Sequence, residues 1–564
     1  MSANLYGWAG LCDRSMLSTL FGLLVTLWAI YEGVSRWYQY RRSWVNVPVV
    51  GATGWIASWK EGRAWMTRAT QVLQEGYDRH GDFAFQFRTA SGWWVCLCDE
   101  AMIKEYMNLS DEYMSLNAYD EVLFETRYTA PGFADSLHHI PVPVLSKALT
   151  WSRGRTNGKN NGYFQELVAE LKLAFASQMN MTADLDTKNR QEINCLHVGM
   201  ELMLRLICKV LVGEPLCRDP RAIELFVRYG SAVPASGAQI AQLPEFLKPV
   251  LGPYFPAARM QRQLGRLIVE QLEQQKSTSG ASEPQVCEAQ WHPSQSAVNT
   301  DPSLIFTIKT IADWIWRWVQ QQDSGCYDKM HVAQLVVAAI FGSVHSAGMV
   351  RRTCLIRPLA MTIHESINTV FVNLQTIAGC LYELCLRPEY IEPLQVEAER
   401  AVRDHGAMSK EAIESLTKID SFIKECQRFR PLAPSALHRV ATQDYTFQNG
   451  LAIPRGTVVL TPNTPILRDE RYYARPQEFD GLRFHRLGQA TGQPDTYKIT
   501  GLSPKSRQFG DGRHTCPGKQ LAADMLRLIL AEFLLNFDVD ASETGQNYPT
   551  FDQQVMSVRK RRVG

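Results

Sequence analysis

At 564 residues the chain is long enough for a large buried core, and this length permits either several domains or one large domain. Lys and Arg number 59 against 57 for Asp and Glu, so the formal charge of +2 gives no electrostatic reason to expect nucleic acid as a partner. Hydrophobic residues make up 45% of the chain, which excludes extensive disorder.

The first predicted element is a membrane anchor near the N-terminus. Met16 to Tyr31 contains no charged residue, and as a helix it reaches about 24 Å of a hydrocarbon core that is roughly 30 Å thick. The preceding segment is not basic and no small-residue cleavage site follows Tyr31, which favours a retained anchor over a cleaved signal peptide. The next residues supply an aromatic interface and a positive, cytoplasmic side: Arg36, Trp37, Tyr38, Tyr40, Arg41 and Arg42.

We therefore expect a single-pass membrane protein with an anchor and basic flank over residues 1–45 and one large cytosolic domain over 46–564. Val47 to Gly54 is rich in turn signals and predicts a hinge after the anchor. Helices are expected at Tyr163 to Met179 and Cys195 to Val212, and a polar loop at 276–302.

Thirteen cysteines are scattered without a paired framework. Cys96 and Cys98 lie close together but lack a second pair at the spacing of a zinc site. A reducing compartment with mostly buried free thiols is the expected setting.

Two polar elements precede the last part of the chain. Glu425 and Arg428 lie three residues apart, on one face if the segment is helical. Leu437 to Leu460 has short β-branched runs between turn signals and predicts hairpins, while Arg483 stands between Phe479 and Phe484.

The strongest local signal is the sequence FGDGRHTCPG, in which a glycine loop ends at Cys516 and a helix is predicted to begin at Pro517. A cysteine at a helix N-terminus favours the thiolate, the form that ligates iron. The glycines leave room for a flat macrocycle to approach the backbone. A lone cysteine in such a loop can equally be structural.

Together these elements resemble the cytochrome P450 family. Phe509, Gly512, Cys516 and Gly518 fall on the family's cysteine-ligand loop, and the E-x-x-R pair of Glu425 and Arg428 is followed by an arginine that it would contact, Arg483. The resemblance implies a mainly α fold with a minor β region, in one large catalytic domain with haem held by the thiolate of Cys516.

The resemblance also assigns residues to the haem propionates. His514 occupies the position where the family usually has arginine, a variant that similar fungal members share, and it would donate to one propionate. Arg439 resembles the second donor, although a surface strand arginine is the alternative.

The oxygen-activating helix carries the main departure from the family pattern. His345 and Ser346 end one apolar segment, the next resumes at Thr369, and these three polar residues are the candidates for proton delivery. Between them lies 347–367, with Pro358 and three arginines that a buried helix would not tolerate. This segment is either a retained intron or gene-model error, or a genuine surface insertion.

The function implied is a haem-thiolate monooxygenase, because an anionic sulfur ligand favours O–O cleavage. NADPH–cytochrome P450 reductase would supply electrons, since the chain has no dinucleotide or flavin motif. A lipophilic small molecule, such as a terpenoid or related fungal secondary metabolite, would be the substrate, and the endoplasmic reticulum membrane the location. The alternatives are a non-oxygenating isomerase and a haem protein silenced by the insertion.

Overall fold

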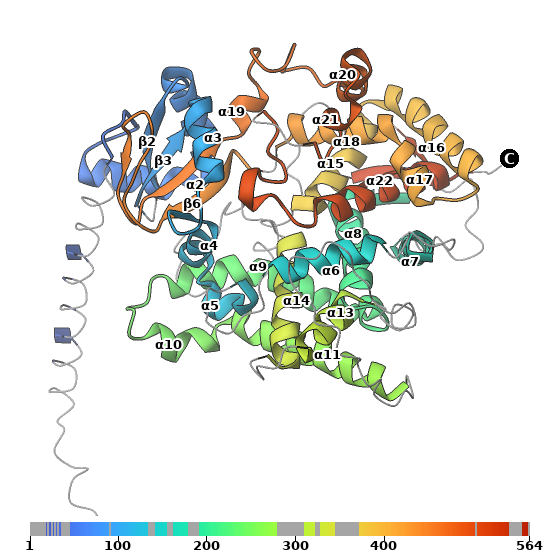
Figure 1. Ribbon diagram of the computed structural model, residues 1–564, viewed down its shortest axis with the longest axis horizontal. Coiled ribbons are helices and arrows are strands. Elements are labelled where there is room, and N and C mark those ends of the chain that lie inside the picture. The colour runs from blue at the N-terminus through green and yellow to red at the C-terminus, as the bar shows by residue number, and fades with distance from the viewer. Residues whose placement is uncertain are drawn as a thin grey trace, which may run out of the picture.

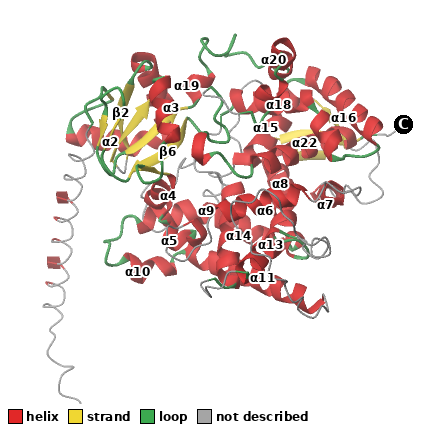
Figure 2. Cartoon of the chain, viewed as in Figure 1, coloured by secondary structure: helices red, strands yellow, loops and turns green. Residues whose placement is uncertain are grey.

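The computed structural model describes residues 45–89, 92–133, 142–154, 162–178, 191–278, 310–321, 327–344, 372–431, 433–501, 505–540 and 555–561, with a few single positions between 19 and 34. Helices dominate and small sheets are attached to them, as expected (Figures 1 and 2). Most of the predicted anchor, and the whole segment 347–367, lie outside the described residues. No helix in the described part is both long enough and apolar enough to cross a bilayer.

The α-helices that the structure describes are α2 (Trp55–His80), α3 (Glu100–Asn108), α4 (Leu116–Phe124), α5 (Thr126–Thr129), α6 (Val142–Gly154), α7 (Gly162–Gln178), α8 (Cys195–Leu211), α9 (Pro220–Ile240), α10 (Lys248–Leu251), α11 (Pro256–Thr278), α13 (Ile311–Gln320), α14 (Lys329–Val344), α15 (Val372–Leu386), α16 (Ile391–His405), α17 (Lys410–Ser415), α18 (Thr417–Phe429), α19 (Thr464–Leu467), α20 (Arg483–Thr491), α21 (Pro494–Tyr497) and α22 (Lys519–Asn536). The two helices expected early in the chain correspond to α7 and α8 within one residue at each end.

The strands form three sheets: β1 (Val49–Val50), β2 (Ala84–Thr89), β3 (Gly92–Leu97), β4 (Met114–Ser115), β5 (Gln191–Asn194), β6 (Ser435–Ala441), β7 (Tyr445–Thr446), β8 (Ala452–Ile453), β9 (Val458–Pro462), β10 (Phe537–Asp540) and β11 (Val555–Lys560). The largest has the order β1-β2-β3-β9-β6-β4. Its strands β6 and β9 come from the segment predicted to form hairpins, and they pair antiparallel.

The predicted hinge after the anchor is wrong in part. Val49 and Val50 form β1, which pairs parallel with β2, and Val45 and Val47 just before it are buried. Gln86 on β2 holds this segment, because its side-chain amide donates to the carbonyls of Val45 and Val47. The segment is therefore part of the folded body.

The main hydrophobic core lies among helices, with α8, α14, α15 and α22 at its centre. These helices are apolar on most sides, so they are stable only when other helices surround them. The sheet and helices α2 and α3 form separate, smaller cores on the other side of the molecule (Figure 1). The predicted site draws on both parts, since β6 with Arg439 belongs to the sheet and α18 with Glu425 packs in the helical core.

Candidate functional site

Cys516 lies in a tight loop just before α22. The amide of Cys516 donates to the carbonyl of Phe509 at 2.8 Å, which folds the loop back on itself. Gly510 and Gly512 have positive φ angles of 70° and 64°, and a Cβ on Gly512 would lie 2.5 Å from the carbonyl oxygen of Met107. Because only glycine fits both the backbone angle and the space, the glycines are what allow the loop to pack against α3.

The helix after this loop begins two residues later than the sequence predicts. Pro517 and Gly518 form a turn, and α22 starts at Lys519 with Gly518 as its N-cap. The amide of Lys519 donates to the carbonyl of Cys516 at 3.3 Å, and the first helical bond runs from Ala522 to Gly518. Cys516 therefore precedes the helix by a turn and does not stand at its first position.

The sulfur of Cys516 has two opposing influences on its ionisation. Burial raises the pKa of the thiol above its usual value, while the backbone amides of Gly518 and Lys519 and the charge of Lys519 lower it. Burial outweighs these contributions, although the amides act in the direction expected of a helix N-terminus. A metal ion would still displace the proton, and the amide donors would then stabilise the anionic ligand.

Arg439 on β6 is buried, with 1% of its surface exposed, so the alternative of a surface arginine is wrong. Its Nη1 donates to the carbonyl of Tyr106 at 2.8 Å and its Nη2 to that of Met107 at 3.2 Å. Its Nε is buried and has no acceptor among the described residues. Burial lowers the pKa of this guanidinium. A buried cation with a free donor fits an anionic group such as a haem propionate.

His514 ends the short 3-10 turn Gly512–His514 within the loop. Its Nε2 lies 2.9 Å from the Oδ1 of Asp111, an exposed residue after α3. Burial lowers the pKa of His514, and the positive charge of Arg439 lowers it further. The charge of Arg439 therefore acts on His514, and both side chains would serve as donors to an anionic edge of haem.

These observations together fit a haem group. Cys516 offers a thiol with amide donors, and Arg439 offers a buried guanidinium with an unused N–H. Gly512 lets the Cys516 loop pack closely against the backbone of α3. The described residues contain no group of three or more His, Cys, Asp or Glu side chains that could hold a metal ion. All nine cysteines in the described part are free, and all except Cys516 are buried.

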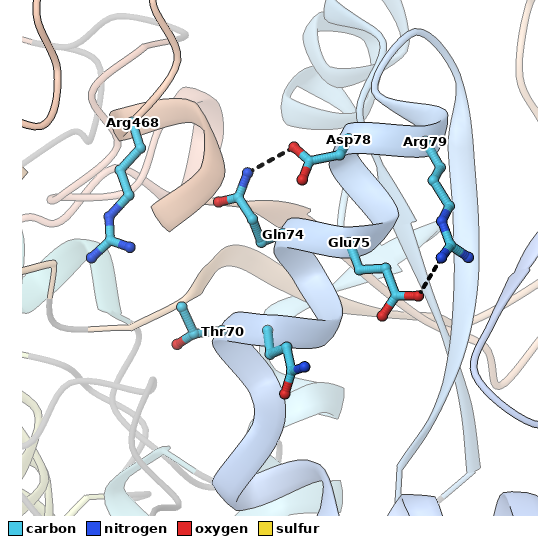
Figure 3. A pocket seen from close by; sticks show the side chains of 7 residues that line it. Thr70, Gln74, Glu75, Asp78, Arg79 and Arg468 are labelled. Carbon is cyan, nitrogen blue, oxygen red and sulfur yellow. Dashed lines mark hydrogen bonds and ion pairs between the residues drawn. The ribbon is translucent and has the colours of Figure 1, made fainter.

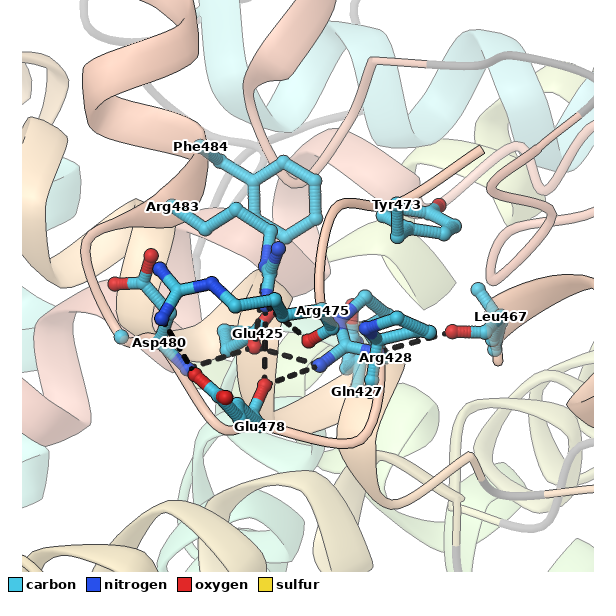
Figure 4. Close-up of polar contacts among 12 residues, drawn as sticks. Glu425, Gln427, Arg428, Leu467, Tyr473, Arg475, Glu478, Asp480, Arg483 and Phe484 are labelled. Atoms are coloured by element: carbon cyan, nitrogen blue, oxygen red, sulfur yellow. Dashed lines mark hydrogen bonds and ion pairs between the residues drawn. The ribbon is translucent and has the colours of Figure 1, made fainter. Parts of the chain in front are cut away.

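Glu425, Arg428 and Arg483 meet in one buried network (Figure 4). Both residues of the predicted pair lie on α18, where the Nε and Nη2 of Arg428 each donate to the Glu425 carboxylate at 2.7 Å. Arg483 begins α20 and donates its Nε to the same carboxylate at 3.2 Å. The pair expected from the sequence is therefore not a solvated surface bridge.

The network also fixes the chain between α19 and α20. Arg428 donates to the carbonyls of Leu467 and Pro476 at 2.9 and 2.7 Å, and Arg483 donates to that of Glu478 at 3.0 Å. A charged donor that is satisfied by carbonyls from an irregular segment orders that segment. The segment just before the Cys516 loop also contacts α18, because the side-chain amide of Gln508 donates to the carbonyl of Gln427 at 3.3 Å.

Three candidate residues, His345, Ser346 and Thr369, lie outside the described residues. The helix expected to carry the first two is present as α14, which ends at Val344. The sequence did not predict that carbonyl groups of α3 bind Arg439, because backbone acceptors leave no side-chain pattern in a sequence.

An open groove of about 730 Å³ lies along α2 (Figure 3). Polar and charged side chains line it: Thr70, Gln71, Gln74, Glu75, Asp78, Arg79 and Arg468. Several of them already bond to each other, with Arg79 at 2.8 Å from Glu75 and Gln74 at 2.9 Å from Asp78. The groove contains none of the predicted site residues, and its polar lining does not suit a lipophilic ligand.

The chain is similar to one known protein family and to several fungal proteins. The sequence profile of the family "Cytochrome P450" matches residues 373–563. Cytochrome P450 monooxygenase janQ of Penicillium janthinellum is 38% identical to the chain, over 93% of each protein. Cytochrome P450 monooxygenase atmQ of Aspergillus flavus is 40% identical, over 93% of this chain and 88% of that protein. Cytochrome P450 monooxygenase paxQ of Penicillium paxilli is 38% identical, over 92% of this chain and 90% of that protein.

Proposed function

The chain belongs to the cytochrome P450 family and is a haem-dependent monooxygenase, and from this premise we propose that it oxidises a terpenoid or related fungal secondary metabolite. The observation that carries the proposed oxidation chemistry is the Cys516 thiol. A glycine loop holds it, and the amides of Gly518 and Lys519 point toward it. The similarity to fungal monooxygenases over nine-tenths of the chain supports a fungal metabolite as the substrate.

Each residue of the site has a proposed task. Haem bound through a thiolate supplies the activation of O₂, for which a reductase provides the electrons from NADPH. Cys516 would hold the iron, and the Nε of Arg439 would bind a propionate. His345, Ser346 and Thr369 are proposed to deliver protons on the substrate side, within a catalytic domain that spans 46–564.

The test compares the full chain with a variant that lacks residues 347–367. Both are expressed with NADPH–cytochrome P450 reductase and offered candidate terpenoids. We expect the deletion to raise turnover, because a proline alone costs a helix interior about 3 kcal/mol. Turnover should need NADPH and add one oxygen atom to the product.

Each alternative has its own outcome in this experiment. Product without NADPH would indicate an isomerase. A carbon monoxide band without product, in both forms of the chain, would indicate a silent haem protein. A full chain that is the more active form would show that the segment is a genuine part of the enzyme.

We propose the endoplasmic reticulum membrane as the location, with the anchor at 1–45 and a second contact on the folded body. The second contact is an exposed apolar cluster around α10, which lies at the edge of the molecule (Figure 1). Phe246, Val250 and Tyr254 are 76%, 60% and 71% exposed. Exposed aromatic and aliphatic side chains in one place are typical of a surface that meets lipid.

This contact predicts an effect on vesicle binding. We expect the triple variant Phe246→Ser, Val250→Ser and Tyr254→Ser, in a chain without residues 1–44, to float with lipid vesicles at least about tenfold less, since each buried apolar side chain contributes about 1.5–3 kcal/mol. Val396→Ser removes a half-exposed valine from α16 and serves as the control. Equal flotation of the triple variant and this control would contradict the second contact.

A further inference from the structure

Tyr106 contacts the guanidinium of Arg439 in two ways. The tyrosine lies on α3 and is fully buried, and its backbone carbonyl accepts from the Nη1 of Arg439 at 2.8 Å. The central carbon of the guanidinium also lies over the Tyr106 ring, 4.8 Å from the ring centre. A cation over an aromatic face is attracted by the electrons of the ring. Tyr106 therefore restrains the arginine through both its backbone and its side chain.

The hydroxyl of Tyr106 binds the sheet that carries Arg439, against which α3 lies (Figure 1). Its oxygen lies 2.5 Å from the carbonyl oxygen of Leu437 on β6 and 2.9 Å from that of Val459 on β9, so it donates its one proton between the two. Burial raises the pKa of the Tyr106 phenol, which keeps this donor protonated. The hydroxyl therefore joins α3 to two neighbouring strands.

The carbonyl of Leu437 belongs to a bulge in β6. Leu437 and His438 together stand opposite a single residue of β9, Leu460. Leu437 has a positive φ of 53°, which is uncommon for a residue with a side chain because the Cβ crowds the backbone. Such a conformation persists only where the surroundings hold it. The hydrogen bond from Tyr106 to the Leu437 carbonyl is one such restraint.

This bulge decides which face of the sheet Arg439 occupies. Successive side chains of a strand alternate between the two faces, so one extra residue moves every later side chain to the other face. Arg439 lies on the face toward α3, where it donates to the carbonyls of Tyr106 and Met107, while its neighbour Val440 packs in the core on the opposite face. Without the extra residue, position 439 would point away from α3.

We propose that Tyr106 is a positioning residue for haem, which holds the β6 bulge and the guanidinium so that the Nε of Arg439 is presented to a propionate. This inference rests on the proposed propionate role of Arg439 and deepens it by identifying what fixes the arginine. Both Nη atoms of Arg439 donate to α3 carbonyls, and its Nε has no acceptor among the described residues. A donor that is already oriented loses less conformational entropy on binding than a mobile one.

The test is a double-mutant cycle on the full, haem-loaded chain with Tyr106→Phe and Arg439→Gln. Haem dissociation is measured in the ferric protein, without substrate or reductase, as transfer of haem to an excess of apomyoglobin. Tyr106→Phe keeps the ring and removes only the hydroxyl. It should speed dissociation about twofold to tenfold, the range for loss of one hydrogen bond, and Arg439→Gln should speed it further.

Coupling between the two substitutions separates positioning from a purely structural role. In a chain that already carries Arg439→Gln, Tyr106→Phe should change haem dissociation by less than about twofold, because the tyrosine acts through the arginine. The haem reduction potential should fall in both single variants, since a cation near haem favours the ferrous state, and should fall no further in the double variant. If Arg439→Gln yields no haem-loaded protein, Arg439→Lys takes its place in the cycle.

Tyr229→Phe is the matched control. It removes another buried tyrosine hydroxyl, which donates to the carbonyl of Thr129 at 2.7 Å and binds neither α3 nor β6. We expect Tyr229→Phe and Tyr106→Phe to lower the thermal unfolding temperature by similar amounts, because each leaves a buried carbonyl without its donor. Only Tyr106→Phe should speed haem dissociation by more than about twofold.

Three results would overturn the inference: unchanged haem dissociation in Tyr106→Phe, equal acceleration by Tyr229→Phe, or the same effect of Tyr106→Phe with and without Arg439. Failure of the propionate role is read separately, as an Arg439→Gln chain that loses haem no faster than the unmodified chain, and the inference would fall with it. The thiolate band in the carbon monoxide spectrum tests the proposed function independently of both residues.

Discussion

Replacing Cys516 with serine is expected to abolish the carbon monoxide difference band of thiolate-ligated haem. Loss of a residue that merely supports a metal ligand typically costs 10–100-fold in affinity or activity, so loss of the ligand itself should lower turnover by more than about a hundredfold. A serine hydroxyl is a poor substitute, because the mechanism depends on an anionic sulfur that donates electron density to iron. The measurement is the spectrum of purified protein with its haem content, followed by product formation with reductase.

The matched control is Cys217→Ser, which changes a buried free thiol in the 3-10 turn Leu216–Arg218. We expect this variant to keep the band and most of the turnover, since its thiol lies outside the glycine loop. A thiolate band that persists in Cys516→Ser would place the iron ligand on another cysteine and contradict the assignment.

Glu425→Gln should lower the free energy of unfolding by about 3–5 kcal/mol, the range for removal of one partner of a buried ion pair. The substitution leaves the guanidinium groups of Arg428 and Arg483 buried without a counter-charge. Urea unfolding monitored by circular dichroism measures the change. The haem content should fall as well, because the segment that leads to the Cys516 loop loses its anchor.

Glu478→Gln is the control for this prediction. Its side chain pairs with Arg475 at the surface, where the two side chains are 60% and 76% exposed, and its backbone carbonyl still accepts from Arg428 and Arg483. An exposed pair of this kind contributes less than about 1 kcal/mol. If Glu425→Gln is no more destabilising than Glu478→Gln, the buried network is not what orders the segment.

Much of the site was visible in local sequence patterns. The glycine loop, the three-residue spacing of Glu425 and Arg428, and the predicted helices at α7 and α8 all involve residues that are near one another in sequence. Positive φ angles and helical periodicity are local constraints, so the residues that satisfy them can be identified from the sequence. The sequence alone therefore determined which cysteine to choose and which acid and arginine to pair.

The tertiary structure decided the features that depend on distant segments. Arg439 is held by carbonyls of α3 from the first quarter of the chain, and the two valines predicted as a hinge become a strand because β2 pairs with them. Burial, which no short motif encodes, raised the pKa of the Cys516 thiol against the effect of the nearby backbone amides. Desolvation and backbone acceptors arise only when remote segments pack together, and for that physical reason they became apparent in the fold and not in the sequence.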